Sequence, residues 1–137
     1  MPYEIVRFPH EGAIDADGHV LEPATLWEDY LEARYRDRAL RIRPDGEGFE
    51  YLEIGGKPSL RTNHGSLGVL GAMGDLDARP SPERRYADAM PFGAGDASER
   101  VALLDRENLE KTVLYPTIGL LWECELDDPE LSLAYQR

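Results

Sequence analysis

The sequence reads Ile14-Asp15-Ala16-Asp17-Gly18-His19-Val20-Leu21-Glu22-Pro23 near its start, and this stretch determines the predicted fold. Residues 13–20 predict a strand. Asp15, Asp17 and His19 fall at alternate positions in it, so they are expected to share one face. The opposite face would carry Ile14, Ala16, Gly18 and Val20. A row of polar side chains is unusual for a strand, and it marks this segment as a candidate for chemistry.

Asp17 and His19 are candidate metal ligands. Side chains at positions i and i+2 of a strand point the same way, about 6–7 Å apart, so both can reach one ion. A carboxylate and a neutral imidazole suit a divalent metal. In a parallel barrel the reactive groups lie at the C-terminal ends of the strands, where this pair falls. Alone the pair is a weak signal, because a polar strand end can equally make backbone hydrogen bonds.

The next segments predict a helix and then a hairpin. Apolar side chains recur at helical spacing over residues 24–35. Two short strands are predicted over residues 39–43 and 48–54, joined by the Pro-Asp-Gly turn sequence of residues 44–47. Two glycines then turn the chain toward residues 57–60.

The middle of the chain is predicted to be irregular. Residues 63–95 are rich in glycine and proline without a clear period, which is typical of a functional lid or a disordered segment. A helix is predicted over residues 97–109, with Asp96 and Glu99 as a capping box. The continuous, β-rich run of residues 111–115 predicts a strand covered on both faces, as in a parallel sheet.

The last segment predicts the start of a helix. Asp128 is a suitable cap and Pro129 a suitable first helical residue, but the sequence stops at Arg137 without a glycine or proline. We therefore expect an unfinished helix. The succession of elements predicts an α/β fold with an inserted hairpin, in which two parallel strands cannot close a sheet.

Composition narrows the classes of function. The 137 residues suit one domain, and 42% of them are hydrophobic. The start has no apolar signal segment, and no apolar run is long enough to span a bilayer. Cys124 is the single cysteine, which excludes an internal disulfide and favours a reducing cytoplasm; its acidic neighbours disfavour a reactive thiolate.

The net charge of −12 argues against two kinds of partner. With 27 acidic and 15 basic residues, the chain would be repelled by a nucleic-acid backbone and would gain little from anionic lipid. We therefore expect neither nucleic acid nor membrane as a partner. The simplest role of the acidity is solubility.

Several segments together resemble one enzyme family. Residues 14–23 resemble the first strand of the amidohydrolase-related family that includes the aminocarboxymuconate-semialdehyde decarboxylase-like enzymes, in which I-D-x-(H/D/E)-x-H opens the barrel. Leu26-Trp27, residues 35–39, residues 98–107 and residues 113–117 are also similar to this family. The resemblance implies the N-terminal portion of a (β/α)₈ TIM barrel with an inserted β-hairpin. Residues 1–137 would be one segment of that barrel domain, with the insertion at about residues 39–95.

The resemblance also implies a site. Asp17 and His19 match the family's two first-strand ligands, although many relatives have histidine where Asp17 stands, and a carboxylate favours a harder ion. The remaining ligands come from later strands that this chain lacks. The implied cofactor is a divalent metal, Zn²⁺ first and Mn²⁺ second. The implied reaction is hydrolysis or non-oxidative decarboxylation of a small, carboxylate-bearing substrate, aromatic substrates included.

Four further side chains are candidates for a substrate pocket. Tyr115 and Thr117 end the second parallel strand, at the same rim as His19. Trp27 is a pocket candidate whose helical spacing equally predicts a core residue, and His64 is a candidate that equally fits a solvated loop.

Two hypotheses therefore stand. The first is a cytoplasmic, metal-dependent enzyme of which this chain is a part, dimeric when complete and inactive as the isolated chain. The second is a non-catalytic binding module whose exposed strand edges are covered by a partner chain.

Overall fold

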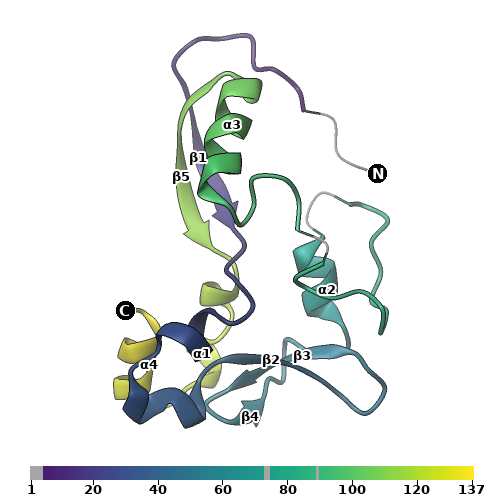
Figure 1. Ribbon diagram of the computed structural model, residues 1–137, viewed down its shortest axis with the longest axis vertical. Coiled ribbons are helices and arrows are strands. Elements are labelled where there is room, and N and C mark those ends of the chain that lie inside the picture. Colours follow the sequence, from purple (N-terminus) through teal and green to yellow (C-terminus); the bar gives the residue numbers. More distant parts are fainter. Residues whose placement is uncertain (1–4, 73–74, 89) are drawn as a thin grey trace.

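The computed structural model describes residues 5–72, 75–88 and 90–137 (Figure 1). β1 (Ala13–Val20) and β5 (Leu109–Pro116) pair in parallel, as predicted for these two segments. α3 (Ala97–Glu107) precedes β5 and packs against it. We call β1, β5 and α3 the strand layer.

The predicted hairpin is confirmed and gains a third short strand. β2 (Arg41–Pro44), β3 (Glu50–Ile54) and β4 (Lys57–Pro58) form an antiparallel sheet in the order β2-β3-β4. Gly55 and Gly56 have φ values of 57° and 84°, which a residue with a side chain rarely adopts, so glycine is needed to turn β3 into β4.

The helix predicted over residues 24–35 is wrong in length. The chain forms α1 (Leu26–Tyr30) and then a separate 3₁₀ helix, η1 (Ala33–Arg38). Leu31 is extended between them, with ψ of 142°. Its carbonyl accepts a hydrogen bond from Nε of Arg36 at 3.1 Å. In a continuing helix this carbonyl would instead accept from a backbone N–H group.

The prediction that residues 63–95 are irregular is wrong for α2 (Ser66–Gly71). Gly68 and Gly71 weaken the helical pattern of this segment in the sequence. A Cβ on Gly68 would lie 2.3 Å from the carbonyl oxygen of Arg84, and one on Gly71 would lie 2.3 Å from that of Tyr86. Residues 75–88 and 90–95 contain neither helix nor strand, as predicted for the described part of this segment.

After β5 the chain makes two 3₁₀ turns, η2 (Ile118–Leu120) and η3 (Glu123–Glu125), before α4 (Pro129–Tyr135). Asp128 caps α4 as predicted, because its Oδ1 accepts hydrogen bonds from the backbone N–H groups of the second and third helical residues at 3.1 Å each. For α3, the predicted capping by Asp96 is also confirmed.

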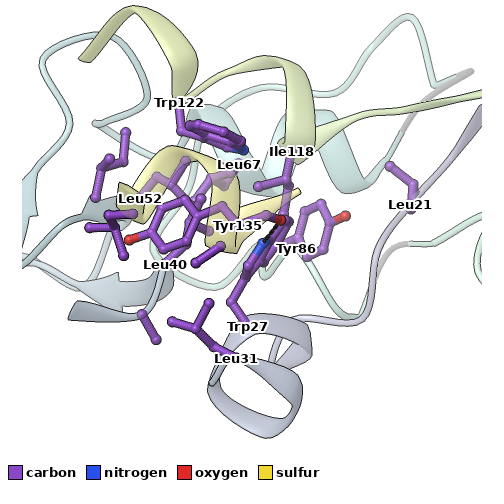
Figure 2. Close-up of a cluster of buried hydrophobic side chains, with 14 residues drawn as sticks. Leu21, Trp27, Leu31, Leu40, Leu52, Leu67, Tyr86, Ile118, Trp122 and Tyr135 are labelled. Carbon is purple, nitrogen blue, oxygen red and sulfur yellow. Dashed lines mark hydrogen bonds between the residues drawn. The ribbon is translucent and has the colours of Figure 1, made fainter. Parts of the chain in front are cut away.

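The hydrophobic core lies away from the strand layer, among α1, β2–β4, α2, η2 and α4, which we call the packed region (Figures 1 and 2). Its buried residues are Leu21, Trp27, Leu31, Ala39, Leu40, Leu52, Ile54, Leu67, Tyr86, Ile118, Trp122, Leu131, Ala134 and Tyr135. The rings of Trp122 and Tyr135 meet edge to face, with centroids 5.2 Å apart. Figure 2 shows the indole N–H of Trp27 donating to the carbonyl of Tyr135, at 3.0 Å.

The strand layer is much less covered. Ile14, Val113 and Leu114 are 56%, 46% and 43% exposed, although they belong to paired strands. The observed architecture is thus a mixed α/β fold with one parallel and one antiparallel sheet. Within the described residues, none of the helices is long and apolar enough to cross a membrane.

Candidate metal site at the end of the parallel sheet

A bulge interrupts β1 within the candidate motif. Asp15 pairs with Thr112 and Gly18 with Leu114, so three residue steps on β1 face two on β5. A Cβ on Gly18 would lie 2.4 Å from Oγ1 of Thr112 and 2.8 Å from Oδ2 of Asp15. The strict alternation predicted for residues 13–20 is therefore wrong, because Gly18 lies on the face of Asp15 rather than opposite it.

Asp15 is occupied by hydrogen bonds at this bulge. Its Oδ2 accepts from Oγ1 of Thr112 at 3.0 Å, and its Oδ1 accepts from the backbone N–H of Asp17 at 3.1 Å. Burial raises the pKa of Glu107 at the end of α3; the guanidinium of Arg100 opposes this increase, and the charge of Asp15 adds to it. Asp15 therefore has a structural hydrogen-bonding role at the bulge.

His19 lies at the C-terminal end of β1, directly beside Tyr115 of β5. The two rings are tilted by 43° with centroids 6.2 Å apart, and the imidazole is half-buried. Nδ1 of His19 is 3.3 Å from Oγ1 of Thr117. Arg100 of α3 donates to the carbonyl of His19, which ties this strand end to the helix. His19, Tyr115 and Thr117 therefore meet at one rim, as the sequence predicted.

Asp17 stands in the bulge itself and is exposed. No group of three or more His, Cys, Asp or Glu side chains in residues 5–72, 75–88 and 90–137 could hold a metal ion. The donor chemistry of Asp17 and His19, one carboxylate and one imidazole whose Nδ1 is already engaged, fits part of a divalent-metal site.

The other two pocket candidates lie elsewhere. Trp27 is 7% exposed and belongs to the packed core, which was the alternative role for it. His64 is an exposed residue with φ of 48° in the turn before α2, which fits the alternative of a solvated loop histidine.

Sequence reasoning assigned no role to Glu22, which holds the rim together. Its side chain is buried, and its carboxylate accepts hydrogen bonds from the backbone N–H groups of Thr117, Ile118 and Gly119 at 3.0, 3.0 and 2.9 Å. The acidic residue before Pro23 was visible in the sequence, but its partners lie about 95 residues away.

Comparison with known proteins links this geometry to one class of structure. No protein-family model and no curated protein sequence matches the chain. Among solved structures, the chain is similar to an amidohydrolase of Mycobacterium avium subsp. paratuberculosis K-10, with a TM-score of 0.63 and 22% identity. The similarity covers 91% of this chain and 36% of that protein, so the chain spans about a third of its length. The resemblance to amidohydrolases is thereby confirmed at the level of the fold.

Proposed function

We propose that the chain is the N-terminal part of a metal-dependent amidohydrolase-type barrel enzyme, in which Asp17 and His19 are two ligands of a divalent ion. The observation that carries the proposal is the position of His19. It lies at the C-terminal end of a parallel strand, two residues after Asp17 in the sequence, with Nδ1 engaged by Thr117. Reactive groups of parallel barrels lie at this end of the strands.

The proposed ion is Zn²⁺, with Mn²⁺ as the alternative. When bound, it would supply a Lewis acid that activates water or grips a carboxylate. The chain's own residues orient the reactants: Asp17 contributes negative charge, and Tyr115 lines the rim beside His19. The reaction is hydrolysis or non-oxidative decarboxylation of a small, carboxylate-bearing substrate, with aromatic compounds as the first to test. The complete enzyme is proposed to be a cytoplasmic homodimer.

The exposed strand layer favours a second candidate. Ile14, Val113 and Leu114 offer apolar surface in a sheet of two strands whose outer edges pair with no other described strand, and such surfaces recruit partner chains. On this account the chain is a binding module without catalysis.

Zinc binding separates the two candidates. Calorimetric titration of zinc chloride into the chain should give weak binding, because two protein ligands leave most of the coordination shell to water. The variants His19→Asn and Asp17→Asn should abolish it, and the exposed-histidine control His64→Asn should leave it unchanged. Zinc binding of undiminished strength in His19→Asn would contradict the proposed metal site and favour the binding module.

Catalysis is expected to need more of the barrel than these residues. The purified 137-residue chain, free of longer species, should therefore show no metal-dependent turnover of aromatic carboxylates or amides. Turnover that a chelator removes and zinc restores would contradict this expectation.

A further inference from the structure

We infer that Glu22 is a positioning residue: it holds Thr117 against Nδ1 of His19 and so reserves Nε2 as the ring nitrogen that takes a ligand. The inference rests on the proposed function, because it names the ligating atom of the proposed metal site. It assigns a role to a buried carboxylate that is not itself a proposed ligand.

The carboxylate of Glu22 binds three backbone N–H groups of the segment after β5. Oε1 accepts from the N–H groups of Thr117 and Gly119, and Oε2 accepts from that of Ile118. The residue is 6% exposed, and a carboxylate buried without partners is costly. Three hydrogen bonds to a charged acceptor offset that cost and are stronger than neutral ones. The segment is therefore fixed relative to the end of β1.

Glu22 is itself held in place. Its backbone carbonyl accepts a hydrogen bond of 3.1 Å from the hydroxyl of Tyr86, a fully buried residue. On the other side, a Cβ on Gly119 would lie 2.8 Å from Cβ of Pro116 and 3.2 Å from Oε1 of Glu22. Glycine at this position allows the backbone to approach the carboxylate closely. Both ends of the contact are thus constrained by the fold.

Thr117, which Glu22 holds through its backbone, is in contact with His19. Thr117 is 6% exposed, and its Oγ1 lies 3.3 Å from Nδ1 of the imidazole. A hydroxyl can donate or accept, so this contact occupies Nδ1 in either direction. An ion on Nε2 requires that nitrogen to be unprotonated. The proton is then on Nδ1, and this N–H group donates a hydrogen bond to Oγ1 of Thr117. That hydrogen bond fixes both the tautomer and the orientation of the ring.

Long-range ¹H–¹⁵N spectra of the labelled chain test this directly. The spectra are recorded in mildly alkaline buffer, before and after zinc chloride is added. In the wild type, zinc chloride should shift Nε2 of His19 and leave Nδ1 protonated. Thr117→Val removes the hydroxyl but keeps the backbone bonds to Glu22, and it should shift the Nδ1 resonance before zinc is added. Thr117→Ser should restore the wild-type spectrum.

Glu22→Gln should shift the same Nδ1 resonance, because an amide can no longer accept all three backbone hydrogen bonds. The matched control is Glu125→Gln. Its carboxylate also holds a loop, through Oγ of Ser59 and the N–H of Leu60, but away from His19, so the histidine resonances should not move. Thr117→Val keeps the test decisive if Glu22→Gln does not fold.

The outcomes separate the inference from the proposed function. Ring-nitrogen resonances of His19 that are identical in wild type and Thr117→Val overturn the inference, as does zinc that binds Nδ1. If the variants move the resonances but zinc moves none of them, the positioning role of Glu22 stands and the metal-dependent function fails.

Discussion

Leucine side chains are buried in the packed region but partly exposed in the strand layer. Leu52 of β3 and Leu131 of α4 are fully enclosed, whereas Leu114 of β5 is 43% exposed. Strands of parallel sheets are normally covered on both faces, so the described residues leave this sheet unfinished. The elements inserted between β1 and α3, by contrast, find their packing partners within the chain. The difference teaches that the stability of this chain and its candidate chemistry reside in different places.

The rim lies where the two regions meet. Leu21 and Ile118 belong to the packed core, while His19 and Tyr115 end the exposed strands. Glu22 spans this boundary. We therefore expect the packed region to hold the rim in shape even though the sheet beside it is poorly covered.

The largest expected effect is a matched pair of leucine truncations. Leu52→Ala in the packed region should lower the free energy of unfolding by about 2–5 kcal/mol, because it leaves a cavity in an enclosed core. Leu114→Ala should cost less than about 1 kcal/mol, because water already reaches that side chain. Chemical denaturation followed by tryptophan fluorescence measures both. Equal losses would show that something covers the strand layer in solution and would break the comparison.

An intermediate effect is expected from Gly18→Ala. The new methyl group would meet Oγ1 of Thr112 and Oδ2 of Asp15, so their hydrogen bond must give way. We expect a loss of about 1–3 kcal/mol. Hydrogen exchange should quicken in β1 and β5 but not in β3. The control Gly46→Ala adds a methyl group with no atom within 4 Å and should change little. An unchanged β1 in Gly18→Ala would argue against the bulge.

The smallest effect concerns the cap of α4. A hydrogen bond from Arg38 at 2.8 Å, then the N–H of Leu131, lower the pKa of Asp128 from its ordinary value of 3.8. A carboxyl with a lowered folded-state pKa stabilises the fold above its unfolded pKa, and this contribution is lost as pH falls through the folded value. Asparagine caps helices about as well, so Asp128→Asn removes chiefly the charge.

Denaturation midpoints of Asp128→Asn should therefore lie slightly below wild type at neutral pH and converge with it in acid. The neighbouring control, Asp127→Asn, should follow the wild type throughout. A gap for Asp128→Asn that widens in acid would reverse the assigned sign.

Local patterns predicted the elements whose signals are local. The β-rich run of β5, the turn between β2 and β3 and the cap of α4 depend on neighbouring residues, and the structure has each of them. The prediction that β5 is covered on both faces is wrong for the described residues, because Val113 and Leu114 are 46% and 43% exposed. Asp17 and His19 could be proposed because they lie two residues apart on one predicted strand, and Tyr115 and Thr117 because they lie at the end of the other.

Contacts between distant residues were not predictable in the same way. Gly68 and Gly71 weaken the helical pattern of α2, yet they are required by the backbone of residues 84–86. The bulge in β1 depends on its register with β5, and the role of Glu22 depends on N–H groups from another part of the chain. No periodicity encodes such partners.

The most direct test of the account is a crystal structure of the chain grown with zinc and measured at the zinc absorption edge. We predict one anomalous peak at the end of β1, about 2.0–2.1 Å from Nε2 of His19 and about 2.0–2.2 Å from a carboxylate oxygen of Asp17. Asp17 and His19 pointing to opposite faces of the strand, with no zinc between them, would contradict the proposed metal site.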